Sequence, residues 1–510
     1  MAYRPLLVVL TLLGVLAPAS PVTAGSAACD SRVNNTFAKL LECVTVDGVR
    51  QHQAAFQAIA DANGGTRASG TPGYDASVDY VVALLQGAGY EVTVQPFNYV
   101  AFSQLGPSTL AQTAPGAVVY VEGTDYQLAD QTEPGDVTAL VTAVDLQLGL
   151  GNTSTSGCEA ADFAGFPAGN IALIQRGICT FQLKAENAAA AGAAGVIIFN
   201  QGNTPERTGL FGGTLSANYA GGIPVLLATY ARGEEWAGTP GLMMHMVADA
   251  LREVVESFNV LAETPGGRAD NVVMVGAHLD SVPAGPGIND NGSGSAAILE
   301  VALQMRKVKP RNKVRFAWWG AEEAVLIGSN FYVASLSEDE LARIALYLNF
   351  DMVGSPNFVR FVYDGDGSAF GLAGPPGSDA IEALFEDFYA SRGLASEPTQ
   401  IDFRSDYAAF FNAGIPFGGL FTGAEGIKTP AQVAVYGGTA GQQYDPCYHQ
   451  ACDTFDNVSL DVLDLNADAI AYAVLQYAMN TQAVNGKKGK GNFKLNVGAP
   501  PERLGPTFIR

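Results

Sequence analysis

The chain has 510 residues, and its 28 Lys and Arg against 50 Asp and Glu give a formal net charge of −22. Such an acidic chain argues against nucleic acid or an anionic membrane as a partner, because both attract a positively charged surface. Hydrophobic residues make up 48% and charged residues 15%, which excludes a disordered protein and supplies a packed core. A chain of this length is expected to form more than one domain.

The N-terminal segment predicts export. One Arg precedes an apolar run from Leu6 to Ala17, and small residues follow up to Ala24. This is the pattern of a cleaved signal peptide, here residues 1–24. An uncleaved anchor is the weaker alternative, because a membrane-spanning helix needs about 20 apolar residues. We therefore expect a protein that is secreted, or delivered to a vacuolar lumen, without stable membrane insertion.

The cysteines and the sequons fit an exported protein. An oxidising compartment and an even number of cysteines favour disulfides, and the six cysteines fall into three local couples. We predict the pairs Cys29–Cys43, Cys158–Cys179 and Cys447–Cys452. Sequons at Asn34, Asn152 and Asn457 predict a glycoprotein, if the host glycosylates. A fourth sequon, at Asn291, lies within the candidate site and is expected to be buried.

Residues 25–106 are expected to form the first part of the main domain. Residues 49–97 predict a helix, a turn, a helix and a strand in that order. The Gly- and Pro-rich residues 63–73 form the turn, because such a segment cannot lie inside a helix or a central strand. Residues 77–87 have helical spacing of Val and Leu and end in glycine.

Residues 107–247 differ from the rest of the chain because they carry little charge and many short apolar runs. The strand-like runs are Ala117–Val121, Ile171–Ile174, Val196–Phe199 and Ile223–Leu227. One helix, Phe181–Ala191, interrupts them and is closed by a glycine. This pattern predicts a compact mixed α/β insert.

Residues 248–485 alternate between predicted strands and helices. The strands are 272–276, 314–319, 345–350 and 417–421, and the helices are 293–308, 380–389 and 467–479. Such alternation predicts an α/β fold with a mainly parallel or mixed sheet and helices on both faces. Residues 486–510 contain lysines and prolines and predict a loose basic tail.

One histidine and several carboxylates follow the strands of this last segment. His278 follows the first strand, Glu322 and Glu323 follow the second, and Asp351 follows the third, while Asp290 precedes a helix. Ligands of such sheets lie at the carboxyl ends of the strands, so these side chains are expected to converge. That many carboxylates repel one another unless cations neutralise them. His nitrogen with carboxylate oxygen suits zinc better than manganese or cobalt.

A second histidine is expected to complete the donor set. His449 lies between Cys447 and Cys452, whose disulfide would hold its loop in place. His52 and His245 have no carboxylate beside them in the sequence and are interpreted as structural or surface residues. The chain lacks GxxxxGK(S/T), HExxH and GxSxG, which argues against an ATPase, a single-zinc protease helix and a serine hydrolase.

The same residues carry a family resemblance. Its motifs are residues 70–74, 278–281, 289–294, 318–323, 351–354, 404–407 and 444–453. They resemble those of the secreted or vacuolar dizinc aminopeptidases of the aminopeptidase Y type. Residues 169–196 resemble a protease-associated (PA) domain. The resemblance covers residues 30–480 approximately, and it implies a three-layer α/β/α zinc-peptidase domain with an inserted PA domain.

The resemblance implies two zinc ions per chain. Asp290 would bridge them. His278 and Asp351 would complete the shell of one ion, and Glu323 and His449 would complete that of the other.

The resemblance also implies roles for five further residues. Glu322 would be the general base beside a metal-bridging water, and Asp280 would accept the imidazole N–H of the nearby histidine ligand. Tyr448 would polarise the scissile carbonyl. Arg404 and Met352 would line the substrate pocket.

The leading interpretation is a secreted, monomeric zinc aminopeptidase that removes large apolar residues from the N-termini of peptides or proteins. A carboxypeptidase on the same fold is one alternative, but it would need a basic cluster, and only Arg404 lies near the motifs. A metal-free receptor is the other alternative, and the intact donor set argues against it.

Overall fold

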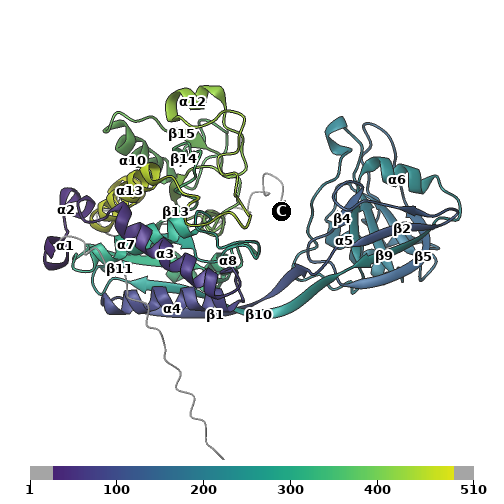
Figure 1. Cartoon of the computed structure of the whole chain (residues 1–510), viewed down its shortest axis with the longest axis horizontal. Helices are drawn as coiled ribbons and strands as arrows, with labels where there is room; N and C mark the ends of the chain where they lie inside the picture. Colours follow the sequence, from purple (N-terminus) through teal and green to yellow (C-terminus); the bar gives the residue numbers. More distant parts are fainter. Residues whose placement is uncertain (1–26, 487–510) are drawn as a thin grey trace, which may run out of the picture.

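The computed structural model describes residues 27–486, so the predicted signal peptide and nearly all of the predicted tail lie outside the described residues. Figure 1 shows two lobes connected by a long two-stranded arm. The arm consists of β1 (Glu91–Gln104) and β10 (Ala250–Glu263), which pair antiparallel along their whole length. Within the described residues, no helix is long and apolar enough to cross a membrane.

The larger lobe contains an eight-stranded mixed sheet with the order β1-β10-β12-β11-β13-β16-β14-β15. Its central strands β12, β11, β13 and β16 run parallel. The bounds of the remaining strands are β11 (Arg268–His278), β12 (Asn312–Trp319), β13 (Ile344–Phe350), β14 (Phe361–Tyr363), β15 (Glu397–Thr399) and β16 (Phe417–Phe421). Every residue of β13 is buried, as expected for a central strand covered on both faces.

Helices cover both faces of this sheet. One core packs α3 (Val46–Ala62), α4 (Pro72–Gly87), α7 (Gly292–Met305), α10 (Ser378–Ala390) and α13 (Leu460–Met479) against the sheet. A second core, on the other face, involves α8 (Ile327–Ser335) and α11 (Tyr407–Asn412). Short helices complete the lobe: α1 (Ala27–Ser31), α2 (Phe37–Leu41), α9 (Glu338–Leu341), α12 (Pro430–Tyr436) and α14 (Gln482–Asn485). The predicted three-layer α/β/α fold is confirmed.

The smaller lobe has an eight-stranded sheet of its own, with the order β3-β2-β9-β5-β6-β7-β8-β4. The strands are β2 (Thr109–Ala114), β3 (Val118–Val119), β4 (Tyr126–Leu128), β5 (Gly135–Val144), β6 (Ile171–Gln175), β7 (Gly195–Phe199), β8 (Val225–Ala228) and β9 (Met243–Ala248). The helices are α5 (Phe181–Ala190) and α6 (Tyr230–Ala237), with 3₁₀ turns at Ala160–Phe163 and Pro205–Arg207. The strand predicted at Ala117–Val121 is only two residues long, because it is an exposed edge strand.

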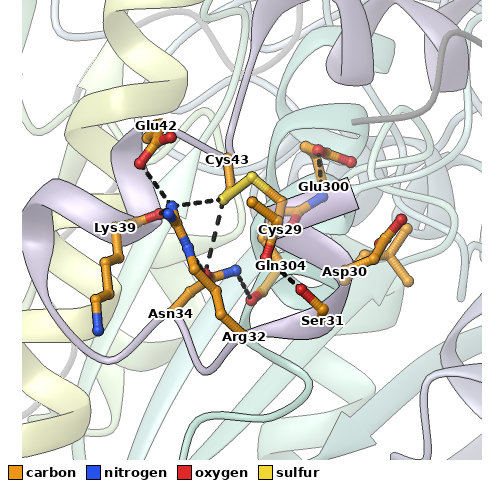
Figure 2. Close-up of a disulfide and its surroundings, with 12 residues drawn as sticks. Cys29, Asp30, Ser31, Arg32, Asn34, Lys39, Glu42, Cys43, Glu300 and Gln304 are labelled. Atoms are coloured by element: carbon orange, nitrogen blue, oxygen red, sulfur yellow. Dashed lines mark hydrogen bonds and ion pairs between the residues drawn. A yellow bond between two sulfur atoms is a disulfide. The ribbon is translucent and has the colours of Figure 1, made fainter. Parts of the chain in front are cut away.

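Three disulfides join the pairs that the local spacing predicts, Cys29–Cys43, Cys158–Cys179 and Cys447–Cys452. The first fixes the N-terminal segment, and Figure 2 shows Arg32 beside it, donating hydrogen bonds to Glu42 and to the Cys43 sulfur. Asn34 lies under the same segment.

The sequon asparagines use their amide nitrogens in the fold. Asn34 is buried, and its Nδ2 donates to the carbonyl of Gln304, 3.0 Å away (Figure 2). Asn152 Nδ2 donates to two main-chain carbonyls, and Asn457 Nδ2 donates to two carboxylates. A glycan leaves Nδ2 one hydrogen, so at Asn152 and Asn457 it would replace one of these hydrogen bonds, and Asn34 is buried. The structure therefore gives no support to the prediction of a glycoprotein.

Candidate metal centre

The predicted site residues lie where the central strands end. His278 is the last residue of β11, Asp351 directly follows β13, and Glu322 and Glu323 follow the end of β12. Asp290 lies in the loop before α7. Because these strands are parallel and adjacent, their carboxyl ends bring the side chains together at one edge of the sheet.

The start of α7 is held close to the sheet by its own sequence. Asn291 caps the helix, and its Oδ1 accepts hydrogen bonds from the N–H groups of Gly294 and Met352. A Cβ atom at Gly294 would lie 2.2 Å from the carbonyl oxygen of Phe350, so only glycine allows this approach. The helix start thereby places Asp290 beside Asp351.

The carboxylate of Asp290 lies between the two histidines. Its Oδ1 is 3.2 Å from His278 Nε2, and its Oδ2 is 3.2 Å from His449 Nε2. His278 Nε2 is also 3.3 Å from Asp351 Oδ1, and His449 Nε2 is 3.0 Å from Glu323 Oε2. The five predicted ligands therefore form two groups of donors that share one carboxylate.

Glu322 lies beside these groups. Its Oε2 is 3.9 Å from His278 Nε2, and the side chain is buried. Burial raises the pKa of the Glu322 carboxyl well above its ordinary value, which His278 opposes and Glu323 reinforces. Burial likewise raises the pKa of Glu323, against the effect of His449. The cluster thus holds more carboxylates than its two histidines can neutralise.

The pKa values of the other groups reflect the same crowding. Burial alone would lower the pKa of His278, but the carboxylates of Glu322 and Asp351 raise it well above its ordinary value. Burial would also lower the pKa of His449, and Glu323 and Asp290 raise it to about 10.

The donor set fits divalent metal ions. Three-donor groups are formed by His278, Asp290 and Glu323, and by His278, Glu322 and Asp351. Glu323 Oε1 and Asp351 Oδ1 are buried and have no hydrogen-bond partner. Buried carboxylate oxygens are normally paired, so these two are available to a cation. Imidazole with carboxylate is a ligand set that zinc accepts.

Asp280 contacts one histidine donor and the backbone of both glutamates. His278 Nδ1 is 3.1 Å from the main-chain oxygen of Asp280 and 3.6 Å from its carboxylate. The same carboxylate accepts the N–H groups of Glu322 and Glu323, at 3.2 and 3.3 Å. Asp280 therefore orients the imidazole chiefly through its carbonyl, while its carboxylate fixes the backbone of the two glutamates.

Residues without a predicted role also hold the donors in position. Ser405 Oγ donates to Asp351 Oδ2 at 2.6 Å. The carboxylate of Asp453 accepts the N–H groups of Asn289 and Asp290, at 2.8 and 2.9 Å. Ser405 lies in the motif 404–407 and Asp453 in the motif 444–453 of the family resemblance. Membership in these motifs is the sequence feature that could have predicted a role for them.

The buried guanidinium of Arg67 ties the turn before α4 to the loop that carries Asp290. It donates to the carbonyls of Pro286 and Gly287, both at 2.8 Å, and to that of Leu279. These three carbonyls lie between His278 and Asp290 in the chain. Arg67 thereby fixes the loop that spaces these two donors.

The cluster opens into a cavity of about 250 Å³. Tyr448 stacks on His449, and its hydroxyl accepts a hydrogen bond from Arg404, which also pairs with Glu425 at 2.6 Å. Met352 lines the cavity. Met352 and His449 have positive φ values of 49° and 57°, an uncommon conformation that concentrates at functional sites. The Cys447–Cys452 disulfide encloses the loop of His449.

Comparison with known proteins assigns the family. The model of peptidase family M28 matches residues 259–474, and that of the PA domain matches residues 137–236. An aminopeptidase of Pseudomonas aeruginosa is 59% identical over 479 residues, covering 92% of this chain and 89% of the relative. The chain belongs to peptidase family M28. This M28 peptidase carries a PA domain in its smaller lobe.

Other relatives of this M28 peptidase agree. A probable lipoprotein aminopeptidase of Mycobacterium tuberculosis is 43% identical and covers 91% of this chain and 90% of its own length. An aminopeptidase structure from Aneurinibacillus sp. strain AM-1 has a TM-score of 0.66 at 30% identity, over 86% of this chain and 96% of that one. A zinc aminopeptidase from Bacillus subtilis has a TM-score of 0.56 at 28% identity, over 84% and 94%.

Proposed function

We propose that this M28 peptidase is a secreted aminopeptidase that uses two zinc ions to release N-terminal residues from peptides. The observation that carries the proposal is the carboxylate of Asp290, whose two oxygens face two different histidines at the same distance of 3.2 Å. The similarity to relatives named as aminopeptidases and to the solved structure of a zinc aminopeptidase supports it. The three disulfides fit an exported protein.

The five donors divide between two ions. His278 and Asp351 would hold one zinc, Glu323 and His449 would hold the other, and Asp290 would hold both. When bound, zinc supplies a Lewis acid that lowers the pKa of water and polarises a carbonyl. Asp280 keeps the imidazole of His278 oriented, because its main-chain carbonyl faces Nδ1.

Glu322 is the general base and then the general acid. Its carboxylate takes the proton of the attacking water and passes it to the leaving amine. Burial raises the pKa of this carboxyl, which favours its holding the proton between the two steps.

Tyr448 stabilises the carbonyl oxygen of the scissile bond. Arg404 donates to the phenol oxygen at 3.2 Å, which leaves the phenol hydrogen free to donate to the substrate. Such donors typically contribute about 3 kcal/mol to the transition state. Arg404 is in turn paired with Glu425, and all three residues line the cavity.

The cavity suits a large apolar side chain and a free amine. Five aromatic or apolar side chains are among those that line it: Met352, Phe361, Tyr363, Phe421 and Tyr444. Carboxylates, including Glu322 and Glu323, line the side of the metal centre and attract a protonated amino group. We therefore propose substrates with a large apolar N-terminal residue.

A carboxypeptidase activity is the less favoured alternative. It would need unpaired basic groups to bind a C-terminal carboxylate. Among the described residues that line the cavity, Arg404 is the only Lys or Arg, and Glu425 already neutralises it.

The test is hydrolysis of leucine p-nitroanilide and of its N-acetylated form, with and without a chelator. We expect turnover of the free amine alone, lost with the chelator. Glu322→Gln should lower kcat by about 10²- to 10⁴-fold while the zinc content is kept. Exposed Glu338→Gln is the matched control. Turnover of the acetylated substrate, or full activity of Glu322→Gln, would refute the proposal.

A further inference from the structure

A second cleft, of about 590 Å³, lies between the larger lobe, the arm and the PA lobe. We propose that this cleft, which we call the arm cleft, binds the peptide segment that follows the scissile bond and disfavours a C-terminal carboxylate there. The proposal rests on the proposed aminopeptidase function. It assigns the substrate class as oligopeptides and protein N-termini rather than dipeptides and tripeptides.

The arm cleft adjoins the metal centre. Glu323 lines both the cavity of the metal centre and the arm cleft. An N-terminal residue whose side chain fills that cavity has its scissile bond at the metal donors. The rest of the peptide must then lead away from the cavity, and the arm cleft begins at Glu323, beside the metal donors.

The arm supplies one wall of the arm cleft. Ala101 pairs with Glu253 across the two strands, and Tyr99 pairs with Val255. All four residues line the cleft. Alternate residues of a strand face opposite sides, so Glu253 and Val255 share the cleft face and Glu256 faces away. This gives Glu253 a matched control on the same strand.

The PA lobe supplies the facing wall, and Arg252 clamps it to the arm. Arg252 donates to the carbonyl of Ala217 at 3.1 Å and to Gln131 Oε1 at 3.4 Å, and it pairs with Glu133. Gln131 in turn donates to the carbonyl of Val100 on the arm. Ala217 and Gln131 both line the cleft, so the clamp preforms its far wall.

The charge of the arm cleft determines what it accepts. Four acidic residues line it, Asp130, Glu253, Asp280 and Glu323, and of these Glu253 is exposed whereas Asp280 is fully buried. None of the described residues that line it is a Lys, Arg or His. A free C-terminal carboxylate two residues beyond the scissile bond would meet the exposed carboxylate of Glu253, whereas an amide or a continuing chain would bring no negative charge to it.

The experiment compares kcat/KM for Leu-Gly-Gly and for its C-terminal amide. We expect wild type to prefer the amide and Glu253→Lys to reduce that preference about two- to fivefold, as for an exposed charge pair. Glu256→Lys makes the same change of charge on the opposite face and should leave the preference unchanged. Equal effects of the two variants, or no preference in wild type, would overturn the proposal.

A second variant tests occupancy. Ala101→Trp should fill the arm cleft and lower kcat/KM for a pentapeptide amide with a free N-terminus and uncharged side chains at least tenfold, while hydrolysis of leucine p-nitroanilide persists. Equal loss on both substrates would overturn the proposal. If this variant does not fold, Glu253→Lys and Glu256→Lys still test the proposal. If the wild-type protein does not hydrolyse leucine p-nitroanilide, the proposed aminopeptidase function is refuted. That result is distinct from the results above, which refute only the proposal for the arm cleft.

Discussion

Single residues decide how the donors of the metal centre are held. Asp351 offers one oxygen to the centre, and its other oxygen accepts the Ser405 hydroxyl at 2.6 Å. Ser405 is itself oriented by Asn349 Nδ2, which donates to it at 2.9 Å. Asn349 precedes Asp351 by two residues on β13, so a chain of hydrogen bonds locks the carboxylate against its own strand.

Ser405→Ala removes the donor that orients Asp351. We expect zinc affinity to fall about 10- to 100-fold, the usual loss when a partner of a ligand is removed. Competition with a fluorescent chelator measures the affinity, and Ser391→Ala, an exposed serine, is the control. Unchanged affinity in Ser405→Ala would show that Asp351 needs no such support.

The sequence predicts the donors themselves better than the residues that support them. His278, Glu322, Glu323 and Asp351 are recognisable because each lies at or just after the end of an apolar strand. Arg67 acts on a loop about 210 to 220 positions away, through main-chain carbonyls that any sequence would provide. No local pattern marks such a contact, and only the folded structure reveals it.

At the scale of elements, the buried strands were predictable and the arm was only partly so. Strands β11, β12, β13 and β16 are short apolar runs, and all four were expected close to where they lie. β10 was missed, because its first half is exposed on the arm and mixes Arg, Glu and Val without a clear period. Its burial depends on the partner strand and on the PA lobe, which no local window contains.

Helix α10 provides a prediction about pH. Glu382 is buried on this helix and accepts the N–H of Asp366, and burial raises its pKa to about 7. Between pH 4.5 and 7 the folded protein keeps a proton that the unfolded chain has lost, so the free energy of unfolding falls as pH rises through this window.

Glu382→Gln removes that dependence. We expect the variant to gain stability over wild type by about 3 kcal/mol at pH 8 and to show little gain at pH 4.5. Thermal unfolding at both pH values measures the difference, with exposed Glu338→Gln as the control. A difference that stays constant across the window would contradict the assignment.

At the scale of the whole molecule, the two lobes have separate cores. The buried clusters of the larger lobe contain no residue of the insert, and those of the PA lobe lie between Leu110 and Ala250. The lobes are connected by the arm, and Arg252 on the arm is hydrogen-bonded to the PA lobe. The insert therefore contributes no buried residue to the cores that support the metal centre.

The insert can be removed at the arm to test this division. Gln104 and Ala250 are paired at its end, so an Asn-Gly turn could replace residues 105–249 and close a hairpin. We expect the shortened protein to hydrolyse leucine p-nitroanilide and to change its selectivity among long peptides. Loss of both activities together, in a protein that still folds by circular dichroism, would contradict independent lobes.

The stoichiometry of zinc tests the central claim most directly. The whole chain, dialysed against metal-free buffer and analysed by inductively coupled plasma mass spectrometry, should hold two zinc ions. Asp290→Ala should lose both, since this carboxylate faces both histidines. A single ion in wild type, or two ions retained in Asp290→Ala, would contradict a centre built around a shared carboxylate.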